Sequence, residues 1–323
     1  MTASESTETP HVPEPKPVRF TADQRYRWDD RWARVPETIC LGITHGIDID
    51  ADGFVYVLHT VHETSTCRDA VCVFDPDGGF VRSWGAAFEG SGHGFQLREE
   101  DGVAFAYVTD LKRGLFKCTL DGEIVWHIER PSIYQTRVHL KYEPTNVALA
   151  PDGDVFLSDG YGSYLIHRFD KNGNQLDVFG GPGNKDHHLA HPHGLIYTER
   201  RGSPELLVGE NIATRLNYLS LDGEHRGFLD VETRRPRHFA ERDGQLLVPD
   251  FYGRITLIDE QDRLVTHLGD TWIDHQHAGE LEKNPPAEGF IRPHDGAIDA
   301  AGRIYVSEYV ATGRLVRLTP IED

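Results

Sequence analysis

Residues 144–170 read PTNVALAPDGDVFLSDGYGSYLIHRFD, and this stretch contains the unit from which the chain is built. An apolar run at 147–150 leads into a Pro-Asp-Gly turn, which is followed by a second run at 155–158 and a third at 166–169. Asp-Gly supplies the positive-φ positions that tight hairpin turns need. The runs are β-branched, aliphatic and aromatic, as the strands of a buried sheet are. The stretch therefore predicts consecutive strands joined by hairpin turns.

The same unit occurs six times, at a spacing of about 50 residues. The second strands of the six copies read VYVLH, AYVTD, VFLSD, LLVGE, LLVPD and IYVSE. Fourth strands such as FVRSWG, EIVWHI and QLDVFG complete four of the copies, and no helical stripe of any length interrupts them. Six four-stranded units without helices predict an all-β fold, a six-bladed β-propeller, and the repeats resemble the NHL class of propellers.

The sixth unit ends after its third strand, so its outer strand has to come from another part of the chain. The segment 26–35 (YRWDDRWARV) precedes the first unit and is the available candidate, with a surface strand or short helix as the alternative. We therefore expect residues 18–323 to form one propeller domain whose last blade is closed by an N-terminal strand. Residues 1–17 are rich in Pro, Glu, Thr and Ser without periodicity, which predicts a disordered tail.

Composition narrows the classes of partner. The chain has 33 basic and 52 acidic residues, and its net charge of −19 repels phosphate backbones, so we expect a small-molecule substrate and no nucleic acid. No apolar run approaches the roughly 20 residues of a membrane span. The four cysteines form no CxxC pair and no secretory leader is recognisable, which predicts a cytoplasmic protein with free thiols. A Cys67–Cys72 bridge is the minor alternative.

The residue that heads each unit is polar, and these heads form an ordered set: His45, His93, Thr145, His193, Arg237 and His294. Three of the histidines are evenly placed, since 193 − 93 = 100 and 294 − 193 = 101, which is two units each time. On alternate blades of a closed ring, these three imidazoles converge on the axis. Three neutral imidazoles with an open fourth position are typical of a catalytic zinc site, or of iron or manganese with added waters.

Each histidine also has an ordinary structural interpretation, because an imidazole at the inner edge of a blade can hydrogen-bond to backbone carbonyls in the channel. His45 has no matching partner on blade 5, so we expect it to line the channel rather than bind metal. Three more histidines precede His193, but we expect them to lie in a solvated loop (His187, His188 and His191).

The head residues and one further segment resemble a known family. The GHG, PHG and PHD segments at His93, His193 and His294 are similar to the metal-binding segments of peptidyl-α-hydroxyglycine α-amidating lyase, a six-bladed propeller. Ser158-Asp159-Gly160-Tyr161 resembles the SDGY segment that carries the family's proposed catalytic tyrosine. The resemblance covers about residues 40–320. It implies catalytic roles for Tyr161 and Arg237, and a structural calcium held by the Asp295 side chain and the Ile47 and Phe95 carbonyls.

Two positions depart from the family. Its blade-one arginine, thought to grip the substrate carboxylate, falls on Thr60, and the methionine two residues before the last histidine is replaced by Arg292. Arg292 can restore the lost positive charge from a neighbouring direction, which predicts a different substrate. We expect Arg292, Thr60, His59 and Tyr252 to bind the substrate at the mouth of the channel.

The sequence thus favours a metal-dependent lyase acting on a small hydroxylated amide or carbinol. One alternative is a metal-dependent hydrolase of the lactonase type, whose calcium is held by carboxylate and asparagine ligands, a set that three histidines fit poorly. Another is a non-catalytic NHL scaffold, which needs no transition metal. If the family resemblance is set aside, Tyr161 is equally well interpreted as an ordinary tyrosine that lines the channel.

Overall fold

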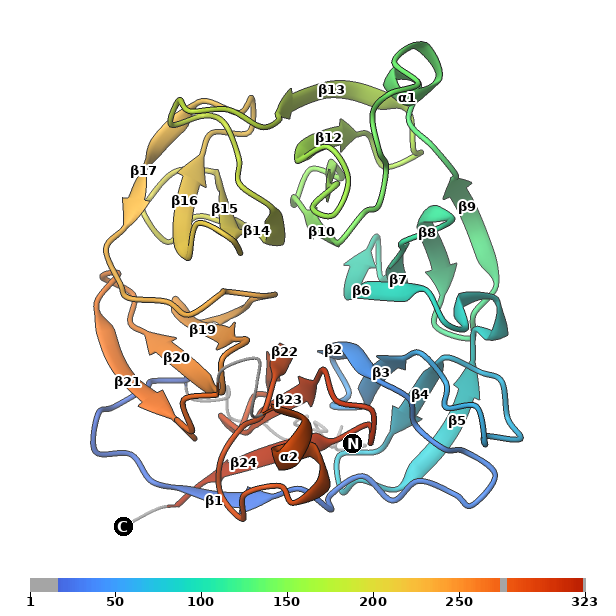
Figure 1. Ribbon diagram of the computed structural model, residues 1–323, viewed down its shortest axis with the longest axis vertical. Helices are drawn as coiled ribbons and strands as arrows, with labels where there is room; N and C mark the ends of the chain where they lie inside the picture. The colour runs from blue at the N-terminus through green and yellow to red at the C-terminus, as the bar shows by residue number, and fades with distance from the viewer. Residues whose placement is uncertain (1–16, 274–277, 322–323) are drawn as a thin grey trace, which may run out of the picture.

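The computed structural model describes residues 17–273 and 278–321, and in these residues six four-stranded sheets stand around a central axis (Figure 1). The strands of each sheet pair antiparallel. They follow one another along the chain in five sheets, and the sixth takes β1 from the N-terminal side. The predicted all-β six-bladed propeller is confirmed.

We number the blades by the order of their head residues. Blades 1 to 3 consist of β2 (Thr44–Ile49), β3 (Val55–His59), β4 (Val71–Phe74), β5 (Phe80–Trp84), β6 (Gly92–Glu100), β7 (Val103–Asp110), β8 (Gly114–Thr119), β9 (Ile124–Ile128), β10 (Asn146–Leu149), β11 (Val155–Ser158), β12 (Leu165–Phe169) and β13 (Gln175–Gly180). Blades 4 to 6 consist of β14 (Pro192–Thr198), β15 (Glu205–Glu210), β16 (Arg215–Leu219), β17 (His225–Leu229), β18 (Ala240–Arg242), β19 (Gln245–Asp250), β20 (Arg254–Ile258), β21 (Leu264–Leu268), β22 (Pro293–Ile298), β23 (Ile304–Glu308), β24 (Leu315–Pro320) and β1 (Tyr26–Asp29).

The ring closes as the sequence predicts, because β1 pairs antiparallel with β24 as the outer strand of blade 6. Trp28 of β1 packs on Phe290, with ring centroids 4.7 Å apart. Ahead of β1, the Val18 N–H donates to Asp243 and the Phe20 N–H to Gln245, so the same segment is also tied to blade 5. The strand is shorter than the predicted segment and ends at Asp29.

The remaining elements are short. They are a 3₁₀ turn, Ala86–Phe88, and the helices α1 (Ile133–Thr136) and α2 (Ala278–Lys283). None of the helices in the described part of the chain has the length and apolarity to cross a membrane. All four cysteines are free, so Cys67 and Cys72 do not pair. The predicted tail, 1–17, lies outside the described residues except for Pro17.

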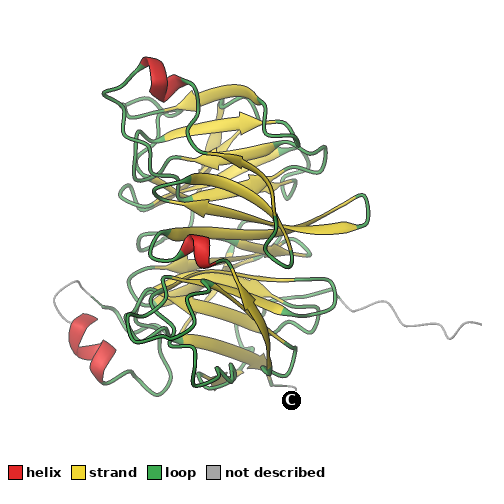
Figure 2. Ribbon diagram, turned by 90° about the vertical axis from the view of Figure 1, so that its right-hand side faces the viewer, coloured by secondary structure: helices red, strands yellow, loops and turns green. Residues whose placement is uncertain are grey.

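The two faces of the ring carry different connections. The face seen in Figure 1 carries the segments that lead into the head residues, including α2, and the long β6–β7 hairpin projects from the opposite side (Figure 2). We call these the front and back faces. Each first strand begins near the front and ends in a tight turn at the back, and in blades 1, 2, 3 and 5 this turn contains Asp-Gly.

Each inner strand that carries a histidine is irregular at its head residue. In blade 2, for example, Gly92 pairs with Asp110 and Phe95 with Val108. Between these two pairs the chain advances three residues on β6 but only two on β7, so β6 carries one extra residue. The same one-residue excess occurs at the heads of blades 1, 4 and 6. It also occurs in blade 5, between the Pro236–Asp250 and Ala240–Leu247 pairs. Such β-bulges redirect side chains and are common beside functional sites.

Glycine follows the head histidine in three blades because the next blade lies too close for a side chain. A Cβ on Gly46 would lie 2.4 Å from the Phe95 side chain, and one on Gly94 would lie 2.6 Å from the Thr145 carbonyl oxygen. At Gly194 the gap is smallest, with the Arg237 carbonyl oxygen 1.8 Å from the Cβ position.

We expect Gly194→Ala to lower the free energy of unfolding by about 3 kcal/mol, because the clash is with backbone of the neighbouring blade and overpacking of this kind is costly. Urea or thermal unfolding measures the change. Gly279→Ala in α2 is the matched control, since a Cβ there meets nothing within 4 Å, and it should be near neutral. Equal stability of Gly194→Ala and wild type would contradict the close approach of blades 4 and 5.

Candidate metal centre

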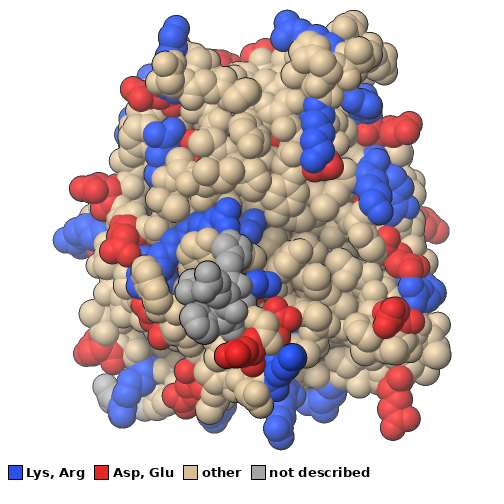
Figure 3. All heavy atoms as spheres, in the orientation of Figure 1, with Lys and Arg blue, Asp and Glu red and all other residues tan. Residues whose placement is uncertain are grey.

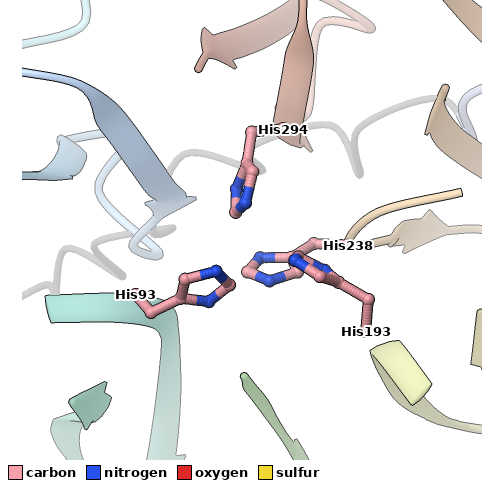
Figure 4. A group of neighbouring side chains, drawn as sticks. All are labelled: His93, His193, His238 and His294. Atoms are coloured by element: carbon pink, nitrogen blue, oxygen red, sulfur yellow. The ribbon is translucent and has the colours of Figure 1, made fainter. Parts of the chain in front are cut away.

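Four buried histidines from four blades meet on the axis (Figure 4). His93 lies on β6, His193 on β14 and His294 on β22, and His238 precedes β18. Each of the four histidines contributes one ring nitrogen, and these four nitrogens all lie within 4.8 Å of one another. The structure thus brings together the three histidines singled out by their spacing and adds a fourth.

The sequence interpretation missed His238 because it stands one residue after the head, Arg237. The bulge turns two successive residues of an inner strand toward the axis. The second of these is glycine in blades 1, 2 and 4, but His238 in blade 5 and Asp295 in blade 6. Comparing this second position across the repeats would have found both side chains.

Backbone carbonyls orient two of the rings. The Nδ1 of His93 lies 2.8 Å from the Thr145 carbonyl oxygen, and the Nδ1 of His294 lies 3.1 Å from that of His45. Each carbonyl belongs to the head residue of the next blade. Since a carbonyl only accepts, both Nδ1 atoms carry the hydrogen, and the Nε2 lone pairs face the centre.

Several other ring nitrogens in the cluster are buried without a hydrogen-bond partner among the described residues. They are Nδ1 of His193, Nε2 of His294 and both nitrogens of His238. Buried polar atoms normally have partners, so these orphans call for a ligand. Burial also holds the pKa of His93, His193 and His294 well below 6.5. They are therefore neutral, the form in which imidazole binds metal. The residues fit a borderline first-row transition metal.

Tyr161 lies against the cluster on the front side. Its hydroxyl is 2.9 Å from Nε2 of His193 and 3.3 Å from Nε2 of His93, and Arg237 Nη1 donates to it at 3.1 Å. Burial raises the Tyr161 pKa, and Arg237 opposes that rise. The phenol is therefore protonated at neutral pH and can donate to a histidine.

Arg237 is a buried cation without an acidic partner. Its guanidinium lies 3.9 Å over the Phe251 ring, and Nε has no hydrogen bond. Within 17–273 and 278–321, no carboxylate forms an ion pair with it. Since burying an unpaired charge is costly, this site favours an anionic or strongly polar ligand group.

The turn that carries Tyr161 is held by a buried carboxylate. Asp159 accepts hydrogen bonds from the Tyr134 hydroxyl and from the N–H groups of Glu143 and Ser163, each at 2.6 Å. Burial raises the pKa of Asp159 to about 6. Three donors on one carboxylate fix the path of the SDGY segment, and so the place of Tyr161.

The acids that end the other second strands are buried and paired with an arginine of the next hairpin, and do not reach the histidines. The pairs are Asp110–Arg113, Glu210–Arg215, Asp250–Arg254 and Glu308–Arg314. Several also accept an N–H from the segment leading to the head of their own blade. They position the head residues.

Two of the predicted substrate-binding residues lie near Arg237. Arg292 is 5.6 Å from the same Phe251 ring and forms an ion pair with Glu282 of α2 at 3.3 Å. The Tyr252 hydroxyl accepts a hydrogen bond from Arg235 at 3.1 Å. In a chain of net charge −19, basic side chains gather beside the centre of the front face, on the side of blade 5 (Figure 3).

The other two, His59 and Thr60, are not brought to this mouth. His59 is fully buried in blade 1, where its Nδ1 accepts N–H groups of Val61 and Gly42 and its Nε2 lies 3.6 Å from the Cys72 sulfur. The Thr60 hydroxyl accepts the Ile43 N–H. Both side chains hold the backbone of blade 1 together.

His45 lies beside the cluster without joining it. Its ring centroid is 4.8 Å from those of both His93 and His294, and burial lowers its pKa to about 3. It lines the channel.

Behind the histidines, the residues expected to hold calcium border a pocket of about 560 Å³ at the back face. Asp295 Oδ2 accepts the Ile47 N–H at 3.1 Å, and Oδ1 accepts the Gly296 N–H at 2.8 Å. Ile47 and Phe95 line the same pocket, together with His238 and Asp48. The structure brings these residues to one place. Calcium binding there stays a prediction.

No family model matches the sequence, and no curated protein matches it. Solved structures do. A streptogramin B lyase is 11% identical with a TM-score of 0.62, covering 94% of this chain and 100% of its own. Virginiamycin B lyase from Staphylococcus aureus is 12% identical with a TM-score of 0.58, over 92% and 100%. A gluconolactonase from Xanthomonas campestris is 14% identical with a TM-score of 0.59, over 97% and 99%.

These similarities, at such low identity, concern the fold. The protein is a six-bladed β-propeller resembling virginiamycin B lyase and gluconolactonase. Its particular feature is a buried four-histidine cluster able to hold a metal ion.

Proposed function

We propose that the protein is a metal-dependent lyase acting on a small substrate whose reacting carbon bears both a hydroxyl group and a nitrogen. The observation that carries the proposal is the contact of one hydroxyl, that of Tyr161, with two histidines of the cluster and with a buried arginine that has no acidic partner among the described residues. The same side chains carry the resemblance to the peptide-amidating lyase, and known propellers of this fold include lyases.

His93, His193 and His294 would hold the metal, which when bound polarises a substrate oxygen. Arg237 binds a carboxylate or carbonyl of the substrate through its guanidinium. Arg292, close to the same phenylalanine, adds positive charge on that side of the mouth. The substrate would therefore enter from the front face with its polar group toward blade 5.

Tyr161 moves the proton. Since its phenol is protonated in the free site, it acts best as a shuttle, giving its proton to the departing nitrogen while it takes the proton of the substrate hydroxyl. The carbon–oxygen bond becomes a carbonyl, and the electrons of the carbon–nitrogen bond leave with the nitrogen. No water is consumed. A small-molecule substrate and cytoplasmic location stay predictions from the sequence.

The test is product identification after incubation with a panel of small N-(α-hydroxyalkyl)amides and, separately, with a sugar lactone. A lyase gives two products whose masses sum to that of the substrate. A hydrolase gives products heavier by one water. We expect the lyase products, and we expect this activity to be lost after dialysis against a chelator and restored when metal is added. Folded, metal-free protein, or activity on the lactone alone, would overturn the proposal.

A further inference from the structure

His238 enters the cluster from the back side, opposite Tyr161. Its ring centroid lies 4.9 Å from that of His294, 5.1 Å from that of His193 and 5.5 Å from that of His93. The side chain is 1% exposed, and neither ring nitrogen has a hydrogen-bond partner among the described residues. It also lines the back pocket. A buried imidazole whose two nitrogens have no hydrogen-bond partner among the described residues, within reach of three others, has the properties of a ligand.

The backbone holds His238 in this place. Its N–H donates to the His294 carbonyl at 3.2 Å, which joins the backbones of two cluster residues directly. The preceding residue, Arg237, donates its N–H to the Pro249 carbonyl at 2.9 Å. The backbone of His238 is therefore fixed between blades 5 and 6.

A carboxylate lies directly behind the ring. Oδ2 of Asp295 is 3.2 Å from Nδ1 of His238, although the ring N–H is not aligned with the oxygen for a hydrogen bond. The carboxylate itself is fixed by the N–H groups of Ile47 and Gly296. A modest rotation of the imidazole aligns Nδ1 with Asp295 and points Nε2 toward the other histidines. Carboxylates in this position set the tautomer and orientation of metal-binding histidines.

We propose that His238 is a fourth ligand of the metal centre and that Asp295 is its positioning residue. This rests on the metal centre of the proposed function but not on the reaction. Four imidazoles fill a tetrahedral shell. An ion that also takes substrate on the Tyr161 side must therefore accept five or six ligands, which favours iron(II) or manganese(II) over zinc.

Cobalt(II) tests the proposal without a substrate, because its visible spectrum reports ligand number and its affinity can be measured by competition with a chelator. The full chain is compared with His238→Ala, His238→Gln, Asp295→Asn and Asp48→Asn. Asp48 is the matched control: it lines the same pocket, but its carboxylate accepts the N–H groups of Leu97 and Ile49 and is not paired with His238.

We expect both His238 variants to change the cobalt spectrum and to weaken binding more than Asp295→Asn does. Asp295→Asn should keep the wild-type spectrum with affinity lowered about 10- to 100-fold, the usual effect of losing an outer-shell partner. Asp48→Asn should match wild type. If His238→Ala fails to fold, His238→Gln takes its place in the comparison, because glutamine keeps a polar side chain of similar size.

A wild-type spectrum and affinity in a folded His238 variant would overturn the fourth ligand and leave a three-histidine centre intact. The melting temperature of wild type and Asp295→Asn is also measured with and without calcium. If Asp295→Asn keeps the cobalt affinity of wild type but loses a rise in melting temperature that calcium gives wild type, the positioning role is overturned and Asp295 is assigned to calcium. A wild-type protein that binds no cobalt would overturn the metal centre, and the proposed function with it.

Discussion

His193→Ala is expected to yield a folded protein that has lost its bound transition metal and its activity. His193 lies at the centre of the contacts, within the four-histidine group and 2.9 Å from the Tyr161 hydroxyl. Losing an outer-shell partner alone lowers metal affinity 10- to 100-fold, so losing a ligand should lower it by more than about 100-fold. Metal analysis of protein purified without chelator or affinity tag measures the content, and His93→Ala and His294→Ala should behave alike.

The stability of the variant separates two explanations of the cluster. With metal bound, wild type gains stability from binding, and His193→Ala should lose that gain and no longer respond to added metal. Without metal, the substitution removes an imidazole whose Nδ1 is unsatisfied and whose Nε2 contacts the Tyr161 hydroxyl, and added metal should affect neither protein.

His187→Ala is the matched control, since His187 lies six residues earlier, is exposed and contacts the ring of His188. It should keep the metal content and the melting temperature of wild type. Equal metal loss in His187→Ala would place the bound metal in that loop, and metal retained by His193→Ala would exclude the axis.

The fold could be predicted from local features because each blade repeats them. Period-two strands and Asp-Gly turns specify hairpins, and the missing fourth strand of the last unit indicates a strand from elsewhere. Tyr26–Asp29 supplies that strand through its pairing with β24. The spacing of His93, His193 and His294 was informative because equal positions on alternate blades must face the same axis.

The rest of the site depends on features that the repeat period does not encode. A one-residue bulge in blade 5 brings two side chains inward, Arg237 to the front and His238 to the back, and only the first stands at the repeat position. His59 ends β3, at the position that Asp159 takes after β11, and Thr60 comes next. Backbone donors from residues 42 and 43 bind their side chains within blade 1. Equivalent positions therefore lead to different surroundings.

The bulges also explain how one ring supports two layers of function. The first bulge position provides the front layer, where His45 packs beside His93 and Arg237 donates to the Tyr161 hydroxyl. The second provides the back layer, where it is glycine in three blades, His238 in blade 5 and Asp295 in the neighbouring blade 6. Substitution of Arg237 in the front layer should therefore alter the reaction, whereas substitution of a cluster histidine in either layer should lower the metal affinity.

Tyr161→Phe is expected to lower kcat by about 10²- to 10⁴-fold while leaving the metal content unchanged, because it removes only the hydroxyl that moves the proton. The ring keeps its packing against His191, with centroids 5.0 Å apart, so the turn should remain in place. The lost hydrogen bonds should cost about 1 kcal/mol of stability. Tyr164→Phe, three residues further along the same turn, is the control and should retain activity. Full activity in Tyr161→Phe would remove the proton shuttle from the mechanism, and loss of metal in that variant would show that the phenol supports the centre rather than the chemistry.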